Sequence, residues 1–88
     1  MTRVELKQSL KEMIVEVCDL DIEPGQITDD ERLINGEGEV DLGSLDAVEI
    51  AAAIDYEYGV RIKDLSAAKS VFRSVDSLAE HIATTKGW

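Results

Sequence analysis

Apolar residues recur every three or four positions in three segments of the chain, and this spacing places them on one face of an α-helix. The first segment begins at Thr2, which with Glu5 has the spacing of a capping box, and we expect its helix to run to about Asp19. The last begins at Ser74, whose hydroxyl can cap a helix, and we expect residues 84–88 to form a frayed tail. The inward positions expected in these two helices are Leu6, Leu10, Met13, Ile14, Val17 and Leu20, and then Val75, Leu78, Ala79 and Ile82.

The middle segment predicts a helix over residues 44–58, in which Ser44 follows a glycine and is expected to be the N-cap. Its inward stripe is formed by Ala47, Ile50, Ala51, Ile54 and Tyr58. The opposite side carries residues that this stripe does not need, namely Leu45, Val48, Glu49, Ala52 and Tyr56. Apolar residues that local packing does not need, beside a serine expected to be exposed, indicate a docking surface.

The connecting segments carry weaker signals. Residues 20–43 form a long connection in which Thr28 and Glu31 repeat the capping-box spacing, and this predicts a short helical turn at residues 32–34. A short helix is expected around residues 65–69. The inward contacts expected in these segments are Leu33 or Ile34, then Leu65, Ala68 and Phe72, and Trp88 at the end of the chain can fold back on the bundle. The pattern therefore predicts an all-α fold, a small four-helix bundle of three main helices and one short helix with a long first loop, in one domain over residues 1–88.

Residues 43–50 read Gly-Ser-Leu-Asp-Ala-Val-Glu-Ile. They resemble the attachment motif of the acyl carrier proteins, which is Asp-Ser-Leu-Asp, one further residue, and Val-Glu-Leu. The agreement extends to a helix that ends at Tyr58 and Gly59 and to the flanking helices, so it covers most of the chain. One position departs, because the family's Asp before the serine is Gly43 here. A plain N-cap is the alternative role for Ser44, and the length of the agreement favours the carrier.

In that family the serine hydroxyl carries 4′-phosphopantetheine through a phosphodiester, and the thiol at the tip of this arm holds an acyl chain as a thioester. The resemblance implies attachment at Ser44, and a helix N-terminus suits an anion because free N–H groups and the positive end of the helix dipole lie there. It implies an acyl carrier for fatty-acid, polyketide or related biosynthesis. The implied partners are a phosphopantetheinyl transferase and acyl-transfer and chain-elongation enzymes with basic docking patches. If partners dock on the outward face of the Ser44 helix, the docking residues expected there and beside it are Asp41, Leu45, Asp46, Val48, Glu49, Ala52 and Asp55.

The net charge of −10 is unevenly distributed. The segment from Glu12 to Glu57 holds fifteen acidic residues and a single base, Arg32, whereas the rest of the chain holds eight bases and four acids. A field of this sign repels nucleic acid and anionic membranes and attracts basic protein surfaces. Cys18 is the only cysteine, and no apolar run reaches membrane-spanning length. We therefore expect a soluble, cytoplasmic monomer that binds neither nucleic acid nor membranes.

The sequence offers little for catalysis or for metal binding. Nothing near Cys18 supplies a base, and the only histidine, His81, is expected on the polar side of the last helix. A loop read from Asn35 places acids at several EF-hand ligand positions, but Val40 stands where glycine is needed and Asp46 where glutamate is needed. We expect no metal site and no enzymatic activity. The alternative to a carrier is a small acidic adaptor that docks through the outer face of the middle helix without covalent modification.

Overall fold

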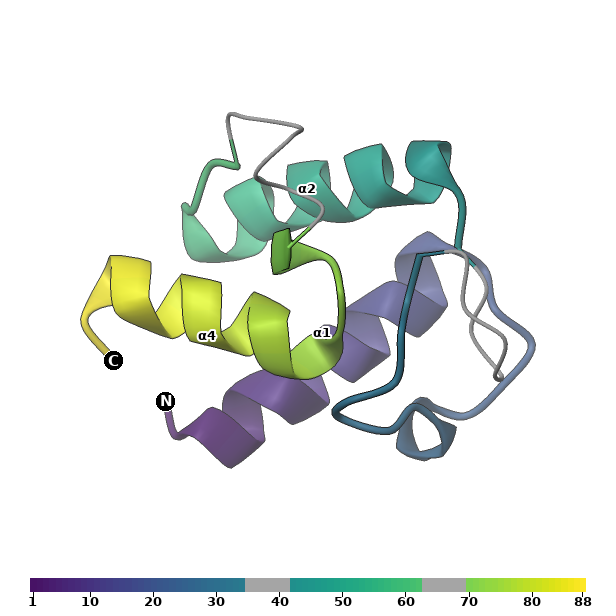
Figure 1. Ribbon diagram of the computed structural model, residues 1–88, viewed down its shortest axis with the longest axis horizontal. Coiled ribbons are helices and arrows are strands. Elements are labelled where there is room, and N and C mark those ends of the chain that lie inside the picture. Colours follow the sequence, from purple (N-terminus) through teal and green to yellow (C-terminus); the bar gives the residue numbers. More distant parts are fainter. Residues whose placement is uncertain (35–41, 63–69) are drawn as a thin grey trace.

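The computed structural model describes residues 1–34, 42–62 and 70–88. Within them the chain forms three α-helices whose bounds are described in full, one short 3-10 turn, and two further helical residues, Ser70 and Val71 (Figure 1). The helices are α1 (Arg3–Val17), α2 (Ser44–Tyr58) and α4 (Val75–Lys86), and the 3-10 turn is η1 (Pro24–Gln26). Helix α1 packs against both other helices. The all-α class is therefore confirmed, while the short helix expected around residues 65–69 lies outside the described residues.

Helix α1 begins with the predicted capping box. The Thr2 hydroxyl oxygen accepts a hydrogen bond from the Glu5 N–H (3.1 Å), and the Glu5 carboxylate accepts one from the Thr2 N–H (2.9 Å). The helix ends at Val17, two residues before the expected end, with Cys18 as its C-cap. The reason is that Asp19 adopts a left-handed conformation (φ 50°), which a continuing α-helix does not allow.

Helix α4 extends further than the apolar pattern indicates. Ser74 caps its start, as predicted, and its hydroxyl oxygen accepts a hydrogen bond from the Ser77 N–H (3.2 Å). The helix continues to Lys86 and ends at Gly87, whose φ of 74° is favourable for glycine, so the predicted frayed tail is wrong. Residues 84–86 at the end of this helix are polar and do not continue its apolar pattern. The apolar pattern alone therefore predicted an end of the helix that is too early.

The chain end folds back on the bundle, as predicted. The Trp88 ring packs edge-to-face against the Tyr58 ring with 6.3 Å between centroids. The Tyr58 hydroxyl in turn shares a hydrogen bond of 2.6 Å with the Ser9 hydroxyl of α1. Residues from α1, α2 and the end of the chain therefore meet at one end of the bundle.

The first loop contains extended backbone where a helical turn was expected. The Leu33 N–H donates to the Arg73 carbonyl (3.0 Å), and the Leu33 carbonyl accepts from the Leu42 N–H (2.9 Å). Both backbone groups of Leu33 are therefore bonded outside this turn. Ile34 and Leu42 form an isolated parallel bridge. The expected helical turn is therefore wrong, although Leu33 is fully buried as predicted.

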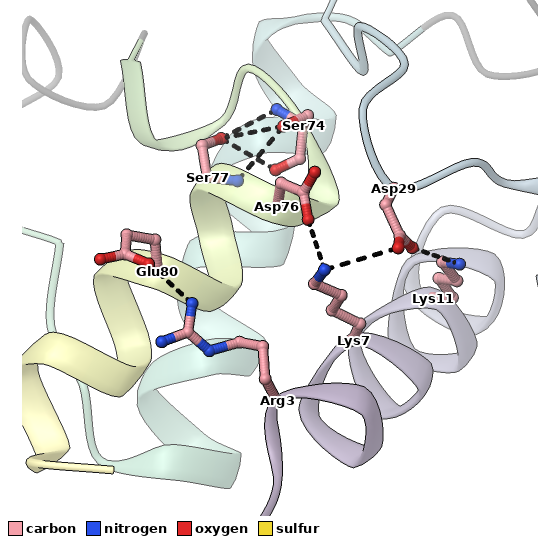
Figure 2. Close-up of polar contacts among 8 residues, drawn as sticks. All are labelled: Arg3, Lys7, Lys11, Asp29, Ser74, Asp76, Ser77 and Glu80. Carbon is pink, nitrogen blue, oxygen red and sulfur yellow. Dashed lines mark hydrogen bonds and ion pairs between the residues drawn. The ribbon is translucent and has the colours of Figure 1, made fainter.

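Ion pairs connect α1 to the first loop and to α4 (Figure 2). Lys7 contacts Asp76 (2.6 Å) and Asp29 (3.5 Å), and Lys11 contacts Asp29 (2.6 Å). The hydrogen bond from Lys11 is the main cause that lowers the pKa of Asp29 below its usual value. A backbone bond from the Asp76 N–H to the Asp29 carbonyl (2.9 Å) reinforces this connection between the loop and α4.

The core is mostly aliphatic, and all but one of the residues predicted to face inward in the three helices lie in it or pack against it. Val17 is the exception, because it is half-buried and lines a groove between α1 and α2. Ile50 and Ile54 of α2 are fully buried, and Ala47, Ala51 and Tyr58 pack against them at the edge of the core. Phe72 is buried as predicted, while Leu65 and Ala68 lie outside the described residues. The other buried side chains are Leu6, Leu10, Ile14, Ile27, Leu33, Leu42, Val60, Val75, Leu78, Ala79, Ile82 and Ala83. Among the described helices, none is both long and apolar enough to span a bilayer.

Candidate functional site

Helix α2 begins one residue earlier than its capping pattern predicts. Gly43 is the N-cap, with extended backbone angles (φ −97°, ψ −177°), and Ser44 is the first helical residue. The prediction that Ser44 caps the helix is therefore wrong. The Asp46 carboxylate, three residues after the cap, accepts a hydrogen bond from the Gly43 N–H (3.0 Å) and so fixes the start of the helix at the glycine.

The first turn of α2 offers backbone donors without a side-chain cap. Gly43 has no side chain, and the first bond of the helix runs from the Ala47 N–H to the Gly43 carbonyl (3.2 Å). The N–H groups of Ser44, Leu45 and Asp46 precede that bond and therefore have no acceptor within the helix. Such groups favour a negatively charged group, so a phosphate attached to the first helical residue fits this end electrostatically.

The outer face of α2 carries large apolar side chains that the core does not cover. Leu45 is 81% exposed, Val48 is 54% exposed and Tyr56 is 88% exposed, and Glu49 and Ala52 are exposed between them. The outward direction predicted for these residues is confirmed. Leu45 and Val48 therefore do not belong to the buried core.

The remaining predicted docking residues differ in their surroundings. Asp46 is half-buried and holds the Gly43 N–H. Asp55 is exposed but faces Arg61, with 3.7 Å between the carboxylate and the guanidinium nitrogen. Asp41 lies outside the described residues. Leu45, Asp46, Val48 and Glu49 therefore share the first two turns with Ser44, and Asp55 lies two to three turns further along.

Cys18 lies at the end of α1 that is nearest to the first turns of α2. Burial raises the pKa of its thiol to about 11, and the negative charges of Asp46 and Glu49 add to this effect. The thiol is therefore protonated at neutral pH, which agrees with a packing role at the edge of the core. Its acidic neighbours follow from the packing of α1 on α2 and are not evident from the sequence of either helix.

No group of three or more potential metal-ligating side chains occurs among residues 1–34, 42–62 and 70–88. Most of the acidic loop in which the EF-hand pattern was considered lies outside these ranges. His81 is half-buried on α4, and its carbonyl accepts a hydrogen bond from the Thr85 hydroxyl (2.8 Å).

Comparison with known proteins identifies one informative relative. The chain is 30% identical over 82 residues to polyketide-8 synthase acyl carrier protein 2 of Streptomyces avermitilis, and the match covers 91% of this chain and 88% of the relative. The chain belongs to the acyl carrier protein family. No family model matches the chain, and no solved structure matches it.

An acyl carrier protein holds an acyl group for other enzymes and does not itself catalyse the reaction. Members of the family generally use a phosphopantetheine prosthetic group and work with acyl-transfer and synthase enzymes. In this acyl carrier protein, two features bear on such a role. They are the first turn of α2, to which the N-cap glycine offers no side-chain acceptor, and the exposed apolar face beside it.

Proposed function

We propose that the Ser44 hydroxyl carries a 4′-phosphopantetheine arm and that the chain transports acyl intermediates as thioesters for polyketide or related biosynthesis. The observation that carries this proposal is that the motif serine of a family member is the first residue of α2, directly after a glycine that leaves the helix start uncapped. When bound, the arm supplies a thiol to which the acyl group is esterified. The polyketide assignment comes from the relative, whose name places it in a polyketide synthase.

The residues around Ser44 have distinct parts in this proposal. The first-turn N–H groups of α2 face the phosphodiester and stabilise its charge. Asp46 keeps the helix start in place through its bond to the Gly43 N–H. Leu45 and Val48 offer apolar contact to a partner enzyme, and Glu49 attracts the basic residues of that enzyme. In our proposal Ala52, Asp41 and Asp55 extend this surface.

Intact mass spectrometry tests the attachment. The purified chain is incubated with coenzyme A and a broad-specificity phosphopantetheinyl transferase, and we expect one arm to be added. Ser44→Ala should abolish the addition, while Ser70→Ala, the same change at an exposed serine outside α2, should leave it unchanged. Absence of the added mass, or an addition that persists in Ser44→Ala, would contradict the proposal and favour an acidic adaptor that works without modification.

The pathway is tested separately with the modified chain. The modified chain is incubated in parallel with acyltransferases of polyketide synthesis and of fatty-acid synthesis, and the acyl thioester that forms is detected by intact mass. We expect efficient loading by the polyketide enzymes. Loading by the fatty-acid enzymes alone would retain the carrier function and reject the polyketide assignment.

A further inference from the structure

A groove between α1 and α2 adjoins the outer face of α2 and shares Tyr56 with it, but Leu45 and Val48 do not line it. Its volume is about 460 Å³, and it is open to solvent. The two helices run antiparallel here (Figure 1). Ser9 in the middle of α1 contacts Tyr58 at the end of α2, and Cys18, just after the end of α1, lies near Asp46 in the first turn of α2. The groove residues that matter for recognition are Glu12, Met13 and Glu16 of α1 and Ala53, Tyr56 and Glu57 of α2.

The half-buried residues of the groove are apolar apart from Ser9, whose hydroxyl is paired with that of Tyr58. Met13 and Ala53 are two of these apolar residues, and Met13 also packs against the core. Tyr56 stands at the edge with 88% of its surface exposed, although aromatic residues of this size usually bury much of their surface. Tyrosine and methionine are enriched in the centres of protein interfaces, where they bury a large apolar area against a partner.

The rim of the groove is acidic. Glu12, Glu16 and Glu57 line it and are exposed, and within the described part of the chain no lysine or arginine lines it. Glu12 accepts a hydrogen bond from the neutral Gln8 amide (3.2 Å), which leaves its charge uncompensated. A partner that covers the apolar residues of the groove must therefore bring positive charge to the rim.

The cations of α1 do not neutralise this rim. Lys7 and Lys11 are turned toward the first loop and α4, where they pair with Asp29 and Asp76 (Figure 2). Arg3 pairs with a glutamate of α4. Helix α1 therefore presents its bases to one side of the bundle and Glu12 and Glu16 to the groove.

We propose that this groove docks an amphipathic segment of a partner protein in which lysine or arginine residues flank apolar side chains. The apolar side chains cover Met13 and Ala53 beside the Tyr56 ring, and the basic residues face Glu12, Glu16 and Glu57. Ala53 lies about 14 Å along α2 from Ser44, at 1.5 Å per residue. The segment therefore binds without covering the first turn of α2, and one enzyme can remain attached while another acts at that turn.

A peptide titration tests this proposal on the unmodified chain, so its outcome is independent of any arm on Ser44. The probe is a short synthetic peptide of leucine and lysine in an amphipathic helical pattern, and a peptide with glutamine in place of lysine is the control. We expect the lysine peptide to shift the backbone amide resonances around Met13, Ala53 and Tyr56 in the labelled protein. Shifts confined to the region of Leu45 and Val48, or no binding, would overturn the proposal.

Two triple variants with the same change in net charge distinguish binding in the groove from a general attraction between the peptide and an acidic chain. Glu12→Gln, Glu16→Gln and Glu57→Gln remove the rim, while Asp21→Asn, Glu23→Gln and Asp30→Asn remove three exposed acids outside it. We expect the rim variant to weaken peptide binding about tenfold and the control variant to weaken it less than about twofold. Equal losses in both variants would overturn the proposal, because binding would then follow net charge alone. Circular dichroism should show unchanged helix content in both, since all six residues are exposed.

Discussion

Among single residues, Gly43 has the clearest effect on how α2 begins. A Cβ added at this position would meet only the Asp46 carboxylate oxygen, at 3.9 Å, and φ is −97°, so a side chain fits without strain. We expect Gly43→Asn to stabilise the fold by about 0.5–1 kcal/mol, because it adds a cap and restricts the unfolded chain. Gly43→Asp should gain less at low salt, since its carboxylate would lie near that of Asp46.

Urea unfolding of the two variants measures this difference. Added salt should bring the stability of Gly43→Asp closer to that of Gly43→Asn, because it screens the repulsion between the carboxylates. A loss of stability in Gly43→Asn would show that the glycine backbone itself is required at the start of α2.

Cys18 is expected to titrate only at high pH. Its folded-state pKa of about 11 lies above the ordinary value of 9.0, so the folded chain holds the thiol proton more tightly than the unfolded chain. The stability that this provides is fully present below pH 9 and is lost as the pH rises through about 11. We therefore expect the free energy of unfolding to fall more steeply over this range in the natural chain than in Cys18→Ala.

Alkylation gives an independent readout of Cys18. At pH 8 the native thiol should react on the order of a hundredfold more slowly than the same thiol in urea, as a pKa difference of about two predicts. Equal rates in the native and unfolded chains would contradict the raised pKa.

At the scale of the helix, α2 divides into a face that supports the fold and a face available to partners. Leu45 and Val48 are exposed, so Leu45→Ala and Val48→Ala should each change the free energy of unfolding by less than about 0.5 kcal/mol. Ile50→Ala, the matched control on the buried face, should cost about 2–5 kcal/mol. Thermal unfolding with circular dichroism measures all three. A loss of several kcal/mol at Leu45 or Val48 would remove that residue from the docking surface.

Charged and apolar residues on this face should affect different steps of binding, the charged ones the association rate and the apolar ones the lifetime of the complex. Glu49→Lys should slow association with the transferase at low salt and leave folding unchanged, because charges at the edge of an interface act mainly on steering. Val48→Asp should weaken the complex at every salt concentration through loss of apolar contact. Surface plasmon resonance measures both rates, and an unchanged association rate in Glu49→Lys would contradict a steering role for that residue.

Helical periodicity predicted the parts of the fold that depend on local sequence. The buried stripes of α1, α2 and α4 follow from spacing alone, because each helix must turn its apolar face to the core. Periodicity did not reveal the extended backbone at Leu33, since its partners Arg73 and Leu42 are distant in sequence. The start of α2 was misplaced by one residue because glycine and serine are both acceptable N-caps, and the bond from Gly43 to Asp46 decides between them.

The candidate site was predictable to a similar extent. The outward direction of Leu45 and Val48 followed from their position off the apolar stripe. The groove between α1 and α2 was not predictable, because it depends on how two helices pack and on which side the lysines of α1 turn. Contacts between elements carry this information, and no single segment contains it.

Across the whole molecule, acidic residues are concentrated where few bases are available. The segment from Glu12 to Glu57 holds fifteen acids and one base. Within the described part of that segment, only Asp29 and Asp55 form ion pairs, with lysines of α1 and with Arg61 respectively. The remaining described acids therefore repel one another with little compensation, and this repulsion opposes the compact state.

Screening by salt should relieve this repulsion. We expect the thermal unfolding midpoint to rise between low salt and a few tenths molar sodium chloride, because the Debye length then falls below about 10 Å. A relief of about 1 kcal/mol would raise the midpoint by about 4–8 °C in a domain of this size. Removal of the exposed charges in Asp21→Asn/Glu23→Gln should raise the midpoint at low salt and reduce its dependence on salt, whereas Lys7→Gln/Lys11→Gln should lower it and increase that dependence. A midpoint that stays constant or falls with salt in the natural chain would show that ion pairs such as Lys11 with Asp29 outweigh the repulsion between the unpaired acids.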